Sequence, residues 1–90
     1  MADFKKLERV CKAVANRRRL AIIAFLKHNG EALVGDIAHA IKLSFKATSK
    51  HLGVLFAVDA VDREQRGMEM WYRLSPSPHF FIGFLIKNLV

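Results

Sequence analysis

The sequence predicts a mainly α-helical fold with one β-hairpin, arranged as a winged helix-turn-helix of about five helices and a two-stranded wing. Two short helical segments, 34–41 and 45–58, are separated by only a few residues, which is typical of a helix-turn-helix. Directly after them the hydrophobic period changes from helical spacing to alternation, which indicates a hairpin. A chain of 90 residues has room for one modest core, so we expect residues 1–90 to form a single winged helix-turn-helix domain.

Two amphipathic helices are expected before the helix-turn-helix. From Asp3 to Val14 the apolar residues recur at spacings of three and four, with charged residues between them. Asn16 can cap a second helix that runs from Arg17 to His28. Asn29-Gly30 follows, and glycine favours the left-handed backbone with which many helices end.

The helix-turn-helix has a buried and an exposed side. Ser44 is a good N-cap for the fourth helix, because its hydroxyl can accept a hydrogen bond from a free backbone N–H. The residues expected to face the core are Ile37, Ala38 and Ile41 in the third helix and Thr48, Leu52 and Leu55 in the fourth. The more exposed residues of the fourth helix are expected to be Lys46, Ser49, Lys50 and Gly53.

Two short runs after the fourth helix form the expected wing. Residues 61–64 and 68–74 flank Gln65-Arg66-Gly67, a short turn in which glycine adopts a positive φ at little cost. Ser75-Pro76-Ser77-Pro78 then interrupts the chain. The last segment, 79–89, is predicted to be a helix that is apolar on almost every side.

The charge balance is strongly basic. Lysine and arginine total 15 against 8 for aspartate and glutamate, which gives a formal net charge of +7. Such a balance suits a polyanion, either nucleic acid or an acidic membrane surface. The helix-turn-helix followed by a hairpin favours double-stranded DNA as the partner.

The fourth helix is the expected DNA-reading element, because a helix in the major groove needs short polar and basic side chains near its N-terminal half. The residues that we expect to contact DNA there are Ser44, Phe45, Lys46, Ser49 and Lys50. Phe45 could pack against a thymine methyl group or act as a hydrophobic staple. The alternative interpretation of this helix is an ordinary solvated face.

The wing and the second helix carry further candidate contacts. We expect the hairpin tip to meet a minor groove or phosphates through Arg63, Gln65 and Arg66, although such a loop can also carry charge for solubility alone. Arg17-Arg18-Arg19 opposes the helix dipole at the start of the second helix, so these residues need an anionic neighbour. Phosphate and a carboxylate elsewhere in the fold satisfy this need equally well.

The first and last helices are the expected dimer interface, because a helix that is apolar all round must be buried on more than one side. The interface residues are expected to be Phe4, Leu7, Val10, Cys11, Phe80, Phe81, Phe84 and Leu85. A two-fold homodimer would place two recognition helices in successive major grooves. The competing hypothesis, attachment of the last helix to a membrane surface, lacks the Lys/Arg-rich polar face that such helices use.

Nearly the whole chain resembles the ArsR-type (arsenic-repressor-like) winged-helix regulators. The likeness lies in Ala15–Ile22, Gly35–Ala38, Leu43–Leu52 and Trp71–Leu74, of which Leu43–Leu52 is the most specific. The resemblance implies a homodimer joined by its first and last helices that binds an inverted repeat near a promoter, usually as a repressor. It also implies that Phe45, Lys46, Ser49 and Lys50 contact bases.

The resemblance gives two further positions a role. His51 matches a common histidine of the family at the edge of the buried side, where it is expected to be structural or to touch a phosphate together with Arg17 and Arg18. Asp59 stands where the family often has glycine, and aspartate tolerates the left-handed conformation.

The chain departs from the family at its metal-sensing positions. Many relatives have Cys-x-Cys in the third helix, where this chain has Leu33-Val34-Gly35, and others use paired ligands on the last helix, where it has only His79. Cys11 and the scattered histidines do not form a converging ligand set, so we expect no metal site and no cofactor. With one cysteine, an internal disulfide is excluded. Cys11 is expected to be a buried small hydrophobe, with a disulfide across the dimer axis as the alternative.

The sequence is compatible to different degrees with three classes of function. A sequence-specific DNA-binding transcriptional regulator is favoured over a winged-helix protein-protein interaction module, because basic side chains are expected on one side of the fold. An enzyme is disfavoured, since the sequence has no recognisable nucleophile-base arrangement or phosphate-binding loop. We expect a cytoplasmic protein, because the N-terminus lacks a secretory signal and 80–90 is too short to span a bilayer. The operator sequence, an inducing signal and the sign of regulation are not encoded in visible residues.

Overall fold

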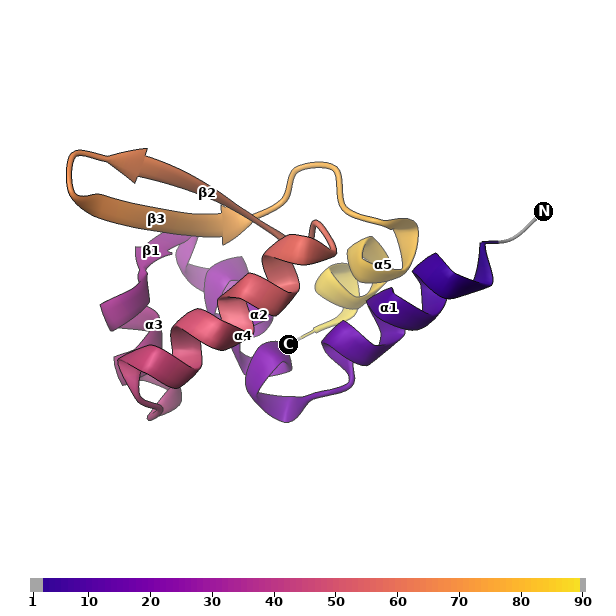
Figure 1. Cartoon of the computed structure of the whole chain (residues 1–90), viewed down its shortest axis with the longest axis horizontal. Coiled ribbons are helices and arrows are strands. Elements are labelled where there is room, and N and C mark those ends of the chain that lie inside the picture. Colours follow the sequence, from indigo (N-terminus) through magenta and orange to yellow (C-terminus); the bar gives the residue numbers. More distant parts are fainter. Residues whose placement is uncertain (1–2, 90) are drawn as a thin grey trace.

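The computed structural model describes residues 3–89. Within that range the chain forms five helices and three strands (Figure 1). In chain order they are α1 (Phe4–Val14), α2 (Arg17–Asn29), β1 (Glu31–Leu33), α3 (Val34–Ile41), α4 (Phe45–Ala57), β2 (Val61–Arg66), β3 (Glu69–Leu74) and α5 (Phe80–Asn88). The expected winged helix-turn-helix is confirmed, with α3 and α4 as the helix pair and β2–β3 as the wing.

Side-chain caps set the starts of the helices. The Asn16 Oδ1 atom accepts from the backbone N–H groups of Arg18 and Arg19, and Ser44 Oγ accepts from that of Ala47, so both predicted caps are confirmed. Asp3 caps α1 in the same way. The last helix begins one residue later than expected, since His79 is its N-cap and accepts through Nδ1.

The sheet has a strand that the sequence analysis missed. β1 pairs with β3 in an antiparallel ladder, so the described sheet has three strands in the order β1-β3-β2 rather than the two predicted. A strand of three residues is too short to display an alternating period, and its partner lies far along the sequence. β1 leads directly into α3, so the sheet is continuous with the helix-turn-helix.

The hairpin turn lies two residues later than expected. β2 extends through Arg66, and the turn consists of Gly67 and Met68 rather than Gln65-Arg66-Gly67. The predicted positive φ is at Gly67, with φ 63°. Asp59, between α4 and β2, has φ 58°, which confirms the expected left-handed turn.

The core lies between the helices and one face of the sheet. The helix-turn-helix contributes Ile37, Thr48, Leu52 and Leu55, all of which are fully buried, as predicted. Further fully buried side chains come from α2 and α5, and they include Ile22, Ile23, Leu26 and Ile82. The buried face of α4 is therefore fixed, and its opposite face is directed to solvent.

α1 and α5 pack together at the end of the molecule away from the wing (Figure 1). Their outer faces carry the most exposed phenylalanine rings of this end, Phe4, Phe80 and Phe84. None of the helices in residues 3–89 is long and apolar enough to cross a membrane.

Candidate nucleic-acid interface

The N-terminal half of α4 presents two unpaired cations. Lys46 and Lys50 are exposed and lie four residues apart, so they share one face of the helix. Within residues 3–89 neither ammonium group has a hydrogen-bond or ion-pair partner. Together with Ser44 and Ala47 they line a shallow hollow of about 220 Å³. This face therefore offers two positive charges that are not paired within residues 3–89.

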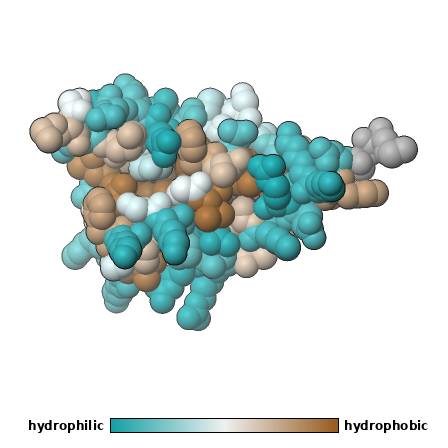
Figure 2. All heavy atoms as spheres, viewed as in Figure 1, coloured by the Kyte–Doolittle hydropathy of each residue, from teal (hydrophilic) through white to brown (hydrophobic). Residues whose placement is uncertain are grey.

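Two further predicted DNA contacts flank these lysines. Ser49 is half-buried beside them. Phe45, the first residue of α4, has 62% of its surface exposed, so its ring is available to a partner. A band of hydrophobic surface lies between α4 and the wing, with hydrophilic surface on both sides of it (Figure 2).

The three predicted wing contacts do not share one face. Because side chains alternate along a strand, Arg63 and Gln65 lie on the face of buried Val61, and Arg66 lies on the opposite face. The Arg63 guanidinium stacks over the Phe56 ring of α4, with Cζ 3.9 Å from the ring centroid. The expectation that Arg66 joins Arg63 on one basic surface is wrong, since the hairpin continues two residues further than the sequence suggested.

Arg66 is held by carboxylates on the outer face of the sheet. Its guanidinium donates to both Glu31 carboxylate oxygens at 2.9 Å and to Glu64 at 3.1 Å. Arg73 also donates to Glu64 at 3.1 Å, and Arg66 lies over the Trp71 ring. The hydrogen bonds from Arg66 lower the pKa of both glutamates, and those carboxylates raise the pKa of Arg66. This carboxylate-arginine cluster joins all three strands.

Two of the three arginines at the start of α2 bind the C-termini of other helices. Arg18 donates to the Ile41 carbonyl at the end of α3, 3.4 Å away. Arg19 donates through Nε to the Ala13 carbonyl and through a terminal nitrogen to the Lys12 carbonyl, both in the last turn of α1. The partial negative charge of a helix C-terminus attracts a cation. The partners expected from the sequence were phosphate or a carboxylate, and the observed partners are instead backbone carbonyls.

His51 belongs to the same contact. Its Nδ1 atom lies 3.1 Å from an Arg19 terminal nitrogen, and since that nitrogen can only donate, Nδ1 is the acceptor and the ring is neutral. Burial lowers the pKa of His51, and the nearby charges of Arg19, Arg18 and Lys50 lower it further. His51 thus connects α4 to α2 and, through Arg19, to α1. Arg17, at the start of α2, is exposed.

The predicted dimer residues fall into two groups. Phe4, Phe80 and Phe84 are 75%, 77% and 61% exposed. Val10 is only 2% exposed and packs in the core of its own protomer, so its predicted interface role is wrong. The remaining predicted residues, Leu7, Cys11, Phe81 and Leu85, are half-buried at the rim. The helical stripe of α1 serves two surfaces, and the sequence could not divide it between them.

Metal-ligating side chains do not converge in the described part of the chain. No group of three or more histidine, cysteine, aspartate or glutamate residues within 3–89 is placed to hold a metal ion. Cys11 is a free thiol, half-buried on α1.

Comparison with known proteins relates the chain to transcriptional regulators. No protein-family model matches the sequence. The chain is 32% identical over 77 residues to the HTH-type transcriptional regulator Rv2034 of Mycobacterium tuberculosis, covering 86% of this chain and 71% of that protein. It is 27% identical over 81 residues to the arsenic resistance transcriptional regulator ArsR1 of Pseudomonas putida. That match covers 90% of this chain but only 63% of ArsR1, so the chain spans less than two thirds of that relative.

A solved structure shares both the fold and part of the sequence. The homodimeric winged helix-turn-helix DNA-binding domain of Mb0332 from Mycobacterium bovis, described as a possible ArsR-family transcriptional regulator, superposes with a TM-score of 0.79 at 30% identity. The match covers 93% of this chain and 74% of that one. The helix-turn-helix, the wing and these relatives agree with one another, and the chain belongs to the ArsR family of winged helix-turn-helix transcriptional regulators.

Proposed function

We propose that this protein is a homodimeric, sequence-specific regulator that binds double-stranded DNA, most simply a repressor at an inverted repeat. The observation that carries the proposal is the pair of unpaired lysines, Lys46 and Lys50, on the exposed N-terminal half of α4. A recognition helix contacts base edges with this half, and lysine donates to guanine or to phosphate. A face kept basic and free of internal partners suits a polyanion better than it suits the interior of a complex with another protein.

The wing contributes a second set of contacts. Arg63 and Gln65 lie on the face of the sheet that is turned toward α4, where they can meet the DNA beside the recognition helix. Arg17, exposed at the start of α2, is the remaining candidate phosphate contact. Arg66 is assigned to the carboxylate-arginine cluster instead of to DNA.

Dimerisation is proposed through the outer faces of α1 and α5. Three exposed phenylalanines, Phe4, Phe80 and Phe84, lie on this end of the molecule, and such rings are costly to leave in water. The Mb0332 domain, which has the same fold, is homodimeric. An isologous two-fold interface at this end would present two copies of α4 to two half-sites about one helical turn apart.

Three further expectations complete the proposal. Residues 1–90 act as one domain, the protein acts in the cytoplasm, and it has no catalytic role. The comparisons support the last point in so far as the matched relatives are transcriptional regulators. No cofactor is proposed.

The test is selection of DNA fragments from the source organism at roughly 0.15 M salt, where non-specific phosphate binding is weak. Enrichment of a two-fold symmetric motif is expected. Retention without a motif would indicate an architectural binder, and no retention would favour the protein-interaction module.

The dimer is tested separately with Phe80→Glu/Phe84→Glu, measured by light scattering and by DNA affinity. We expect a folded monomer that binds the selected operator far more weakly. Met68→Glu is the control for the light-scattering measurement, because Met68 is fully exposed and lies in the wing turn, away from α1 and α5 (Figure 1). A double variant that stays dimeric would place the interface elsewhere.

A further inference from the structure

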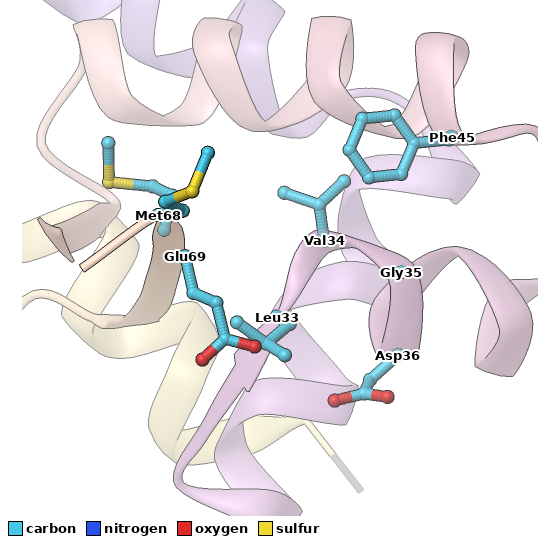
Figure 3. A pocket seen from close by; sticks show the side chains of 8 residues that line it. Leu33, Val34, Gly35, Asp36, Phe45, Met68 and Glu69 are labelled. Atoms are coloured by element: carbon cyan, nitrogen blue, oxygen red, sulfur yellow. The ribbon is translucent and has the colours of Figure 1, made fainter. Parts of the chain in front are cut away.

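A hollow of about 340 Å³ lies between the wing turn and the starts of α3 and α4 (Figure 3). This volume is within the range of small-molecule sites. Phe45 and Val34 form one side, and Met68 and Glu69 of the wing lie across from them, with Leu33 between. Segments from three parts of the chain therefore border one hollow, which is open to solvent on the side of Met68 and Phe45.

The lining is apolar and polarisable. Val34 is buried and forms part of the wall, and the thioether groups of Met68 and Met70 come from the turn and β3. Methionine adapts its shape to varied ligands. The Phe45 ring is 62% exposed, so its face is open to a bound group. An aromatic face attracts an organic cation within about 6 Å of its centroid.

The charge of the hollow is opposite to that of the protein. In a chain with a net charge of +7, the ionisable residues that line it are Asp36 and Glu69. Both carboxylates lie at its rim on the side of Leu33 (Figure 3). Glu69 lies directly across the ladder from Arg66, on the outer face of the sheet. Among residues 3–89, however, neither Glu69 nor Asp36 forms an ion pair, whereas Glu31 and Glu64 nearby are both paired with arginines.

We propose that this hollow binds a small lipophilic organic cation, such as an amine or quaternary ammonium compound with an aromatic or branched alkyl group. The apolar wall buries the hydrocarbon part, and the Phe45 ring and the two carboxylates attract the positive charge. An anion is disfavoured by Asp36 and Glu69. A neutral compound gains only the apolar contact.

Occupation of the hollow competes with DNA, because Phe45 belongs to both surfaces. A ligand that covers the Phe45 ring occupies the start of the recognition helix, so it lowers the apparent DNA affinity. This competition rests on the proposed function, but the binding of the cation does not.

The binding is tested with benzyltrimethylammonium as the probe, followed by backbone amide NMR shifts of the labelled protein. Saturable shifts are expected around Gly35, Asp36, Glu69 and Met70. Benzenesulfonate should produce none, and benzyl alcohol should bind more weakly. Asp36→Asn/Glu69→Gln should weaken probe binding by about three- to tenfold, since exposed charge pairs contribute modestly.

Two variants make this test specific. Glu8→Gln removes one exposed carboxylate on α1, so compared with Glu69→Gln it separates a local effect from a change in net charge. Phe45→Leu keeps the apolar surface but removes the aromatic face, and it should also weaken binding. Shifts scattered over the surface, or equal affinity in Asp36→Asn/Glu69→Gln, would overturn the proposed site.

The competition is measured by fluorescence anisotropy of labelled operator, with tetramethylammonium at the same concentration as the ionic-strength control. The probe is expected to raise the apparent Kd for DNA in the wild type and to do so less in Asp36→Asn/Glu69→Gln. Localised probe binding with no change in the Kd for DNA would leave the site standing and refute competition. Loss of DNA binding in every sample would count against the proposed function instead.

Discussion

The lysines on α4 and the cations near the ends of the other helices differ in what their charged groups touch. Lys46 and Lys50 have no partner within residues 3–89. By contrast, four other cations each donate a hydrogen bond to a backbone carbonyl at or near the C-terminal end of a different helix. The donor and acceptor pairs are Arg9 and Ala57 of α4, Arg18 and Ile41 of α3, Arg19 and Lys12 of α1, and Lys27 and Leu89 after α5. A basic composition therefore does not by itself mark a nucleic-acid site, because part of it stabilises helix ends.

The largest effect on DNA binding is expected when the charges of the two unpaired lysines on α4 are reversed. Lys46→Glu/Lys50→Glu should weaken operator binding by about 100-fold or more and reduce the slope of log K against log salt by about 2, since two phosphate or base contacts are lost. The melting temperature should stay nearly constant, because neither lysine contacts the protein. Fluorescence anisotropy over a salt series measures the first effect, and calorimetry measures the second.

Lys5→Glu/Lys6→Glu is the matched control for this charge reversal. Both lysines are exposed on α1, at the far end of the molecule from the start of α4 (Figure 1). Equal loss of affinity in this control, with the dimer intact by light scattering, would mean that the overall charge, and not the α4 face, binds DNA.

Substituting a cation that binds a helix C-terminus should lower the stability of the fold more than a substitution of an exposed cation does. Arg19→Met removes donors to two carbonyls of α1 and the contact with His51, so we expect a loss of about 1–2 kcal/mol in the free energy of unfolding and a fall of roughly 5–10 °C in Tm. Arg17→Met, two residues earlier on the same helix, should leave Tm unchanged and weaken DNA binding. Identical profiles for the two variants would remove the distinction between helix-capping and DNA-binding arginines.

His51 makes the Arg19 contact sensitive to acid. Its pKa lies below the ordinary 6.5, so below that pH the unfolded chain binds a proton that the folded chain excludes. The stability that neutral His51 contributes is therefore complete at pH values above the His51 pKa of the unfolded chain. It decreases as the pH falls from that value through the lower His51 pKa of the folded chain. Between about pH 7.5 and about pH 5.5 the wild type should lose more Tm than His51→Gln, whose side chain can still accept from Arg19. Parallel curves for the two proteins would show that another group titrates.

The smallest expected difference in operator affinity is between substitutions on the two faces of the wing. Arg66→Gln should change operator affinity by no more than about twofold, whereas Arg63→Gln should weaken it severalfold. Arg66→Gln should also raise the pKa of Glu31 and Glu64 toward 4.5, which carboxyl NMR titration measures. In the wild type the cluster is fully formed above that value and weakens as the pH falls through the lowered pKa values of the glutamates. A larger loss of affinity for Arg66→Gln than for Arg63→Gln would return Arg66 to the DNA surface.

The helices could be predicted because their signals are local. Asn16 and Ser44 mark two helix starts, the inward residues recur at helical spacing, and the short segment between Ile41 and Phe45 identifies the helix-turn-helix. The exposed positions of Lys46 and Lys50 follow from the same period, once Thr48 and Leu52 are assigned to the core.

What could not be predicted depends on residues far apart in the sequence. β1 is a strand only because β3 pairs with it, and Arg66 leaves the DNA surface only because Glu31 lies beside it in that sheet. The carbonyls that bind Arg18 and Arg19 carry no sequence signature at all, since every residue has one. The hollow beside Phe45 was missed for the same reason, because three separate segments form it.

The pairing of β1 with β3 also bears on the order in which the protein folds. Contacts between distant residues form late, since they must overcome the entropy of closing a long loop. An isolated two-stranded hairpin is marginally stable, so the wing is stabilised when β3 pairs with Glu31–Leu33, which leads into α3. A chain leaving the ribosome can thus shape its recognition helix early, but it completes the sheet only after Leu74 has emerged. We therefore expect the wing contacts with DNA to become available only after this late pairing.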